Sequence, residues 1–174
     1  MYIYIETDTL LQVKDLKDAS DDYVNDATIV ASLYYLKTLL AAAGSIVDLG
    51  GEPNKITIPV PLGHGLITAD VIRLIGSSNY NVEYTLTDSA DQTITIASAY
   101  TAETLLGSEV IYKGLKNAIN LSVTSQDSVG NYQGTLPGAT VALTFNSLYW
   151  LMYHISSPAI LIRKKVKAIY YEGE

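Results

Sequence analysis

The amino-acid sequence predicts an all-β protein. Short apolar segments with two-residue alternation recur along the 174 residues and are separated by turn residues. Tyrosine, which favours strands, occurs 14 times. Hydrophobic residues make up 48% of the chain and charged residues 17%, which is enough apolar material for a core and argues against disorder. A chain of this length can form one large β domain or two small ones.

The first fifty residues contain two predicted β regions. Residues 2–13 are of β type, and a charged connection follows over residues 14–22. Apolar residues alternate along residues 23–36, which suits a sheet with one buried face. Residues 36–43 are ambiguous, because their leucines and alanines have helical spacing and also suit a continued strand. Residues 49–54, Leu-Gly-Gly-Glu-Pro-Asn, form the clearest linker.

The middle of the chain, residues 56–112, is predicted to form a self-contained unit. About five short strands are separated by turns every eight to twelve residues, a pattern typical of a small barrel. A single helical turn is expected over residues 102–106.

The remainder of the chain resumes the first β pattern. Residues 118–123 alternate, and residues 129–136 predict a turn that feeds a short strand, which Pro137 then stops. Two long apolar strands follow over residues 147–155 and 160–171. These strands need partners, which the first fifty residues can supply.

Three motifs outside the middle unit resemble those of a known family. They are Leu16-Lys17-Asp18-Ala19 with Tyr23-Val24-Asn25-Asp26-Ala27-Thr28; then Gly130, Tyr132, Gly134, Leu136 and Pro137; and finally Tyr149 to Tyr153 with Arg163, Ala168 and Tyr170. Together they resemble a group of small Ig-like proteins encoded among tailed-phage structural genes. The resemblance covers roughly residues 13–36 and 118–171.

The middle unit carries a second resemblance. Residues 64–72, His-Gly-Leu-Ile-Thr-Ala-Asp-Val-Ile, are similar to a motif of a small β-barrel module named after a domain of ubiquitin-activating enzymes. Such modules recur in phage tail and neck proteins. Ala69 departs from the motif, which has a glycine there to permit a backbone turn.

The two resemblances imply a discontinuous fold. An Ig-like β-sandwich would be made of residues 1–50 plus 115–174 and would be interrupted by a small β-barrel over residues 55–113. Gly50-Gly51 and Gly114 would be the junctions, since a module whose ends lie close together can be inserted into a loop.

The residue types needed for catalysis or metal binding do not gather in the sequence. There are no cysteines, so disulfides and thiolate metal sites are excluded. His64 lacks ligand partners at metal spacing, so it is expected to bond its own loop backbone, and His154 is expected to be a half-buried strand residue. An acidic cluster lacks the order of a calcium loop and is interpreted as a solvated turn; it comprises Asp18, Asp21, Asp22 and Asp26. We therefore expect no enzyme activity, cofactor or metal.

A protein interface is the best-supported kind of site. The net charge of −7 disfavours nucleic acid as the main ligand, yet four of the eleven basic residues fall within residues 163–167. Such a run is either a solvated strand edge or a surface that docks on an acidic partner. The strand at 147–155 is apolar on both sides, so it lies in the middle of a sandwich or meets a partner. The candidate interface residues are Tyr149, Trp150, Tyr153, Arg163, Lys164, Lys165 and Lys167.

The phage resemblance implies a non-enzymatic virion structural protein. It would be a capsid decoration or cement protein, or a head–tail neck subunit, assembled in the host cytoplasm. Its partners would be major capsid, portal, neck or tail proteins and copies of itself, with no direct nucleic-acid or membrane contact. Two alternatives remain open, namely a tail or baseplate adaptor and a carbohydrate-binding module for surface attachment.

Overall fold

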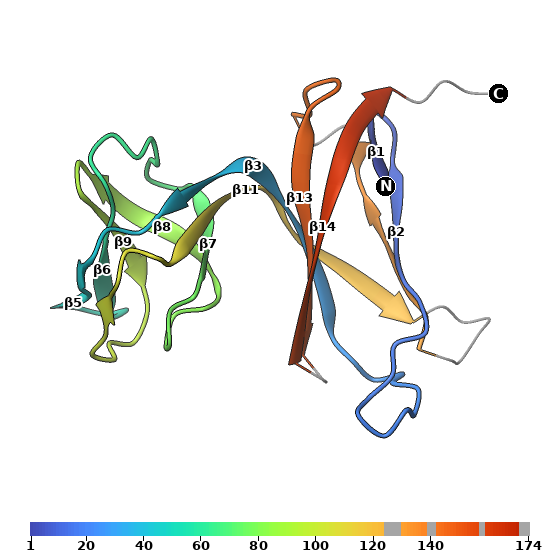
Figure 1. Ribbon diagram of the computed structural model, residues 1–174, viewed down its shortest axis with the longest axis horizontal. Coiled ribbons are helices and arrows are strands. Elements are labelled where there is room, and N and C mark those ends of the chain that lie inside the picture. The colour runs from blue at the N-terminus through green and yellow to red at the C-terminus, as the bar shows by residue number, and fades with distance from the viewer. Residues whose placement is uncertain (124–129, 139–141, 157–158, 171–174) are drawn as a thin grey trace. The chain divides into compact units, whose positions relative to one another are not determined.

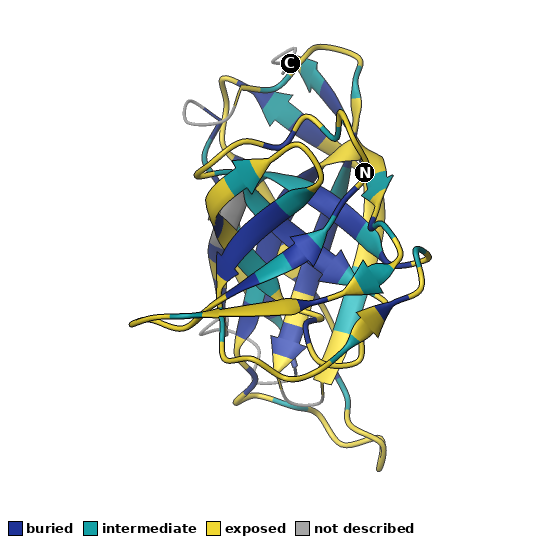
Figure 2. Ribbon diagram, turned by 90° about the vertical axis from the view of Figure 1, so that its left-hand side faces the viewer, coloured by how far each residue is buried: buried dark blue, intermediate teal, exposed yellow. Residues whose placement is uncertain are grey.

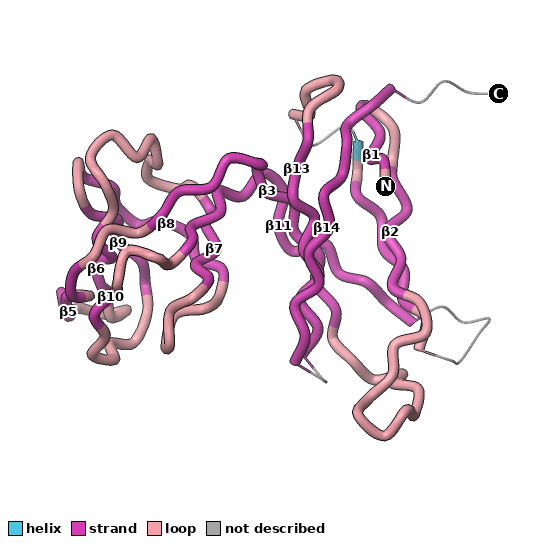
Figure 3. Tube along the Cα trace, in the orientation of Figure 1, coloured by secondary structure: helices cyan, strands magenta, loops and turns pink. Residues whose placement is uncertain are grey.

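The computed structural model describes residues 1–123, 130–138, 142–156 and 159–170 (Figure 1). Apart from a short helical turn at Gly138, these residues form strands and loops, which confirms the all-β prediction (Figure 3). Among them, no helix has the length and apolar character needed to cross a membrane. Val129 and Tyr171, at the limits of predicted strand segments, lie outside the described residues.

The chain divides into two compact units. Unit 1 comprises residues 1–34 and 115–174, and unit 2 comprises residues 35–114. Two long strands, β3 (Ile29–Leu40) and β11 (Val110–Val123), begin in one unit and end in the other. The second unit is therefore inserted into the first, and the chain enters and leaves it along continuous strands.

Unit 1 holds two sets of strands around one core. Its remaining described strands are β1 (Tyr2–Ile5), β2 (Thr9–Val13), β12 (Tyr132–Leu136), β13 (Leu148–Ser156) and β14 (Ala159–Tyr170). One set has the order β1-β14-β13-β3, and β11 links β3 to the second set, β12 and β2. The pairing of β1 with β14 is parallel, whereas β13–β14, β11–β12 and β12–β2 are antiparallel.

The core of unit 1 follows from strand alternation. In β2 every second residue is buried, and in β13 the odd-numbered residues from 149 to 155 are buried. Figure 2 shows that buried residues gather on strands, whereas the loops are mostly exposed. Because successive side chains of a strand point to opposite faces, the residues of one face of each strand lie in the interior. Met152, on the other face of β13, is also buried. Both strand sets supply this interior, as shown by the buried residues Ile3, Leu11, Ile29, Leu33, Leu121, Leu136, Leu151 and Val166.

Gly130 joins the two motifs that are far apart in the sequence. Leu16 N donates a hydrogen bond of 3.0 Å to Gly130 O, and Gly130 N donates one of 2.7 Å to Asn25 Oδ1. Gly130 has a φ of +66°, and a Cβ at this position would lie 2.4 Å from Leu16 O. The turn therefore requires glycine both for its backbone conformation and for the close approach of another backbone segment.

Tyr132 makes a second connection between these motifs. Its side chain is 1% exposed, and its hydroxyl accepts a hydrogen bond of 3.0 Å from Ala27 N while donating one of 2.9 Å to Val24 O. The hydroxyl thus satisfies two backbone groups of the chain that leads into β3, groups that would otherwise be buried without a partner.

Unit 2 is a second antiparallel assembly with its own core. Its strands, besides the ends of β3 and β11, are β4 (Gly44–Ser45), β5 (Val47–Gly50), β6 (Lys55–Pro59), β7 (Val71–Ile75), β8 (Glu83–Ala90), β9 (Thr93–Ala97) and β10 (Thr104–Leu105). They follow the order β11-β7-β8-β9-β6-β5, with β10 and β4 forming a separate pair. Ala42 N, just beyond β3, donates a hydrogen bond of 3.0 Å to Pro59 O at the end of β6. The core includes Ile56, Ile58, Ile72, Leu74, Leu86, Ile94, Ile96 and Ile111.

Three local expectations differ from the structure or are decided by it. The ambiguous stretch 36–43 is strand as far as Leu40, since β3 continues into it. The helical turn predicted over 102–106 is wrong, because residues 104 and 105 pair with β4 as strand β10. Gly50 ends β5 and Gly51 begins the turn to β6, so these residues are not a linker between units. Residues 35–50 lie in unit 2.

Replacing Ala69 by glycine is expected to stabilise unit 2. Ala69 has a φ of +71°, a left-handed conformation that costs a non-glycine residue about 1–2 kcal/mol. Since glycine also makes the unfolded chain more flexible, we expect a net gain of about 0.5–1 kcal/mol in the free energy of unfolding. Urea unfolding followed by circular dichroism measures this gain. Ala99→Gly, in an exposed loop, is the control, and an equal change in both variants would contradict the explanation.

Glu103 is expected to make unit 2 sensitive to acid. Burial raises the pKa of its carboxyl, but hydrogen bonds from Ser78 N at 2.7 Å, Ser77 Oγ at 2.9 Å and Asn79 N at 3.0 Å outweigh burial and lower it. A lowered carboxyl pKa stabilises the fold above the ordinary value of 4.5, and this contribution disappears as the pH falls through the lowered value.

The variant Glu103→Gln tests this prediction, because it removes the charge of the carboxylate. We expect it to cost about 1 kcal/mol at pH 7, from the loss of charge-assisted hydrogen bonds. The difference between wild type and variant should shrink as the pH is lowered from 6 to 3, measured by urea unfolding at each pH. A difference that is independent of pH would show that the carboxylate charge does not stabilise this loop.

Candidate functional site

The β13–β14 hairpin separates the candidate interface residues onto two faces. Trp150 pairs with Lys165 across the hairpin, and Leu151 pairs with Lys164. Directly paired residues share one face of an antiparallel sheet, and neighbouring residues alternate between faces. Trp150 and Lys165 therefore lie on one face, whereas Lys164 lies on the other, which is the core face.

Two of the three predicted aromatic interface residues belong to the core of unit 1. Tyr149 is 3% exposed, and Tyr153 is fully buried. The hydroxyl of Tyr149 accepts a hydrogen bond of 2.8 Å from Thr144 N. The structure thus corrects the grouping of Tyr149 and Tyr153 with Trp150 on one contact surface, because alternation turns them to the opposite face.

The outer face of the hairpin carries a basic surface, here called the outer strip, formed by Trp150, Arg163, Lys165 and Lys167. Lys165 Nζ lies 5.2 Å from the centroid of the Trp150 ring, a cation–π contact that fixes both side chains. Arg163 and Lys165 are exposed, and Lys167 is half-buried. Within the described ranges, neither Lys165 nor Lys167 forms a salt bridge. The strip is therefore a local positive surface on an acidic chain, with one aromatic ring at its centre.

The other face of the hairpin borders a groove in unit 1, here called the β2–β14 groove. It has a volume of about 440 Å³. It is lined by Leu10, Gln12 and Val13 of β2, by Met1 and by Lys14, which follows β2, and by Tyr153, Ile162 and Lys164 of the hairpin. Lys164 Nζ lies 5.7 Å from the centroid of the Tyr153 ring. Gln12 and Lys14 were not among the predicted site residues, although they alternate with the apolar Leu11 and Val13, a pattern that marks an outward face.

Tyr153 has an unusual hydroxyl. It is buried, and it has no hydrogen-bond partner in the part of the chain that the structure describes. Burial raises the pKa of Tyr153 to about 12, because the phenolate would lose its hydration. The hydroxyl therefore stays protonated and able to donate a hydrogen bond throughout the neutral range.

The raised pKa of Tyr153 predicts a loss of stability in alkali. Between the ordinary value of 10.0 and about 12, the unfolded chain releases this proton before the folded chain does, so folding becomes less favourable as the pH rises. We expect a loss of at most about 2 kcal/mol between pH 9 and 12 that is absent in Tyr153→Phe. Urea unfolding at several pH values tests this. Tyr2→Phe, at a residue that is 56% exposed, is the control and should behave as wild type.

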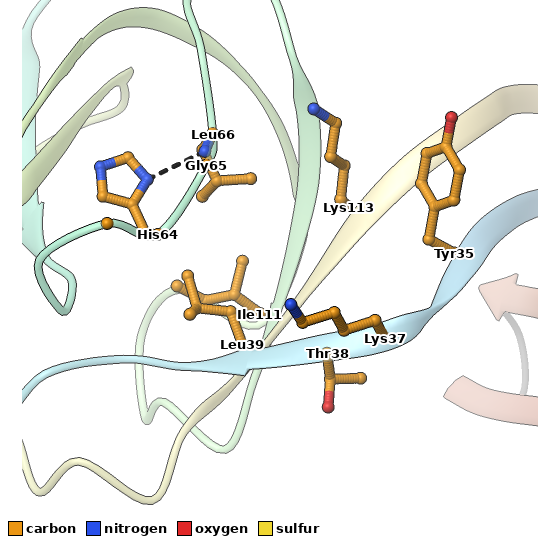
Figure 4. A pocket seen from close by; sticks show the side chains of 10 residues that line it. Tyr35, Lys37, Thr38, Leu39, His64, Gly65, Leu66, Ile111 and Lys113 are labelled. Carbon is orange, nitrogen blue, oxygen red and sulfur yellow. Dashed lines mark hydrogen bonds between the residues drawn. The ribbon is translucent and has the colours of Figure 1, made fainter.

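A second hollow lies within unit 2, beside His64 (Figure 4). Its volume is about 430 Å³, and Leu39, Leu66 and Ile111 give it an apolar lining. Figure 4 shows Lys37 and Lys113 extending from the neighbouring strands, and Lys113 Nζ forms a salt bridge of 2.7 Å with Asp70.

Both ring nitrogens of His64 form hydrogen bonds with backbone groups. Its Nδ1 accepts a hydrogen bond of 3.0 Å from Leu66 N, so the proton resides on Nε2, which lies 2.9 Å from Ala90 O and donates to it. Both ring nitrogens therefore hold backbone groups, as expected for a loop histidine. The other titratable side chains among the described residues that line the hollow are Tyr35, Lys37 and Lys113.

The remaining polar candidates have local structural roles. Asp18 Oδ1 accepts hydrogen bonds from Ser20 N at 2.8 Å and from Asp22 N at 3.1 Å, so the acidic cluster shapes a turn. His154 is exposed and not half-buried as expected, because it lies on the outer face of β13. No group of three or more potential metal ligands is found in residues 1–123, 130–138, 142–156 and 159–170.

The comparisons with known proteins identify no relative of this chain. No protein-family model, no curated protein and no solved structure matches it. The outer strip and the β2–β14 groove are therefore the features from which its function is inferred.

Proposed function

We propose that this protein is a non-enzymatic structural protein of a tailed-phage virion, acting as a capsid decoration or cement protein or as a head–tail neck subunit. The observation that most supports the proposal is the contact between the two motifs of the resemblance. Gly130 and Tyr132 of the later motif bond Leu16, Val24 and Asn25 of the opening motif. Because these hydrogen bonds connect the two motifs, the motifs belong to one structural unit and support the resemblance jointly.

The proposal includes a fold for each unit. Unit 1 would be an Ig-like sandwich, which is supported by two strand sets that share one core. Unit 2 would be a small barrel, which is supported by the hydrogen bond from Ala42 N to Pro59 O that links the end of β3 to the end of β6.

The outer strip would be the contact surface. Arg163 and Lys165 would face acidic groups of a neighbouring virion protein, and Trp150 would supply apolar contact area beside them. A single contact of this kind is weak, but a virion presents many copies, so the contacts reinforce one another.

Imaging of particles tests the proposal. Electron cryomicroscopy of tailed particles that carry this protein should show its density repeated on the capsid, the neck or the tail. The double variant Lys165→Glu/Lys167→Glu should be incorporated much less than wild type, whereas Lys55→Glu, an exposed lysine of unit 2, should be incorporated normally. Absence of the protein from purified particles would overturn the proposal.

The alternatives differ in location and ligand. A tail or baseplate adaptor, which the motif at residues 64–72 favours, would be recognised by density on the tail. A carbohydrate-binding module would need an exposed aromatic platform, but Tyr149 is buried and Lys165 lies over Trp150. A glycan array with Trp150→Ala as control separates this alternative, since glycan binding that the substitution removes would replace the structural role.

A further inference from the structure

The β2–β14 groove lies between two strand edges that have no neighbouring strand. β2 pairs with β12 on one side, and no other described strand pairs with it. β1 accompanies β14 only over Lys167–Tyr170, so the half of β14 that contains Ile162 and Lys164 has β13 as its one described partner strand. Exposed edges of this kind can accept an additional strand through backbone hydrogen bonds.

The side chains around the groove define the chemistry of a ligand. Lys14 and Lys164 are exposed, and neither forms a salt bridge with a carboxylate in the described residues. Leu10 is 54% exposed and Ile162 is half-buried, so they offer apolar area beside the two charges. The groove therefore combines two cations with an apolar wall.

The buried hydroxyl of Tyr153 is the second indication of a ligand. Tyr153 lines the groove, and no described residue accepts its proton. A buried hydroxyl without a partner costs free energy, which an incoming acceptor removes. A carboxylate can accept this proton and also attract the ammonium groups that line the groove, whereas a neutral acceptor satisfies the hydroxyl alone.

We propose that the β2–β14 groove binds an extended acidic segment of a partner protein. The segment lies along the edge of β2, whose five residues suit a strand of similar length. An Asp or Glu side chain of the segment interacts with Lys14 and Lys164 and accepts a hydrogen bond from Tyr153. This inference goes beyond the proposed virion role, because the groove and the outer strip lie on opposite faces of the hairpin.

Selection from a displayed library of random ten-residue peptides tests the inference. Selection against the full chain should enrich peptides in which Asp or Glu alternates with apolar residues. Fluorescence anisotropy with a labelled selected peptide should show binding at least tenfold weaker for Lys14→Glu/Lys164→Glu. Lys165→Glu, on the opposite face of the same strand, is the matched control and should bind as wild type.

Tyr153→Phe separates ligand binding from folding. It should weaken the same peptide about tenfold, the effect of losing one hydrogen bond to a charged group, while the free protein stays folded. Selection without acidic enrichment, unchanged binding by Lys14→Glu/Lys164→Glu, or equal weakening by Lys165→Glu would each overturn the inference. None of these results affects the virion role, which is read from incorporation of the outer-strip variants into particles.

Discussion

Gly130→Ala is expected to cost unit 1 about 4 kcal/mol or more in free energy of unfolding, the largest effect among single substitutions considered. A Cβ at this position would lie 2.4 Å from Leu16 O and 2.7 Å from Leu16 N, both backbone atoms that cannot rotate away. Relief of the clash would break the hydrogen bond from Leu16 N to Gly130 O and expose buried groups, in addition to about 1–2 kcal/mol of left-handed strain. Urea unfolding followed by the fluorescence of Trp150, the only tryptophan, measures the loss.

Gly50→Ala is the matched control for this prediction. Gly50 has nearly the same φ, +64°, but nothing lies within 4 Å of a Cβ built on it. Its substitution should therefore cost only about 0.5–1 kcal/mol, because the backbone strain of about 1–2 kcal/mol is partly offset by the stiffer unfolded chain. Urea unfolding with circular dichroism measures this cost. Similar losses in the two variants would show that the close approach of Leu16 does not matter.

Tyr132→Phe is expected to destabilise unit 1 by about 2–4 kcal/mol. The substitution removes one hydroxyl but leaves two backbone groups, Ala27 N and Val24 O, without their partner. Each buried group left without a hydrogen bond costs about 1–3 kcal/mol. The loss should appear as a lower urea midpoint with an unchanged dependence on urea concentration.

Tyr153→Phe makes the same chemical change in the same core with the opposite expectation. Because the hydroxyl of Tyr153 has no described partner, its removal should leave stability unchanged or raise it by up to about 1 kcal/mol. Comparable destabilisation by both substitutions would contradict the assignment of the two hydroxyls. Together, the pair separates a tyrosine that holds the fold from one whose hydroxyl is left for a ligand.

Local patterns predicted the strands well because alternation is a property of the chain itself. The alternating residues of β2 and β13 are buried as their spacing requires. The turn at Gly130 and the partner role of the short strand after it were also readable from residue types. The contact of this turn with Leu16 could not be predicted, since the sequence of a turn does not show which other segment packs against it.

The first of the two unit boundaries could not be predicted from local signals. Gly50-Gly51 has the composition of a linker, but glycines also suit a tight turn. Gly50 ends β5, and Gly51 begins the turn that leads to β6. The chain actually passes from unit 1 to unit 2 between Tyr34 and Tyr35, in the middle of β3. β3 contains no glycine, proline or polar run at this boundary, whereas β11 passes through the other boundary at Gly114.

The candidate site was predicted only in part, because local patterns do not show how strands pack against one another. Alternation implied that Tyr149 and Trp150 point to opposite faces, but it could not say which face the core would occupy. The β2–β14 groove was beyond prediction, because Lys14 and Lys164 lie far apart in the sequence and line one groove only once the strands are packed.

The parallel pairing of β1 with β14 has a mechanical consequence. Tyr2 lies beside Lys167 and Ile5 beside Tyr170, so the leading end of the first strand and the trailing end of the last are at opposite ends of one ladder. Force that pulls these two ends apart shears the two strands along each other, so it acts on all the hydrogen bonds between them together. The strands then separate only when all these hydrogen bonds break at once. This arrangement resists pulling far better than one in which the bonds break one after another.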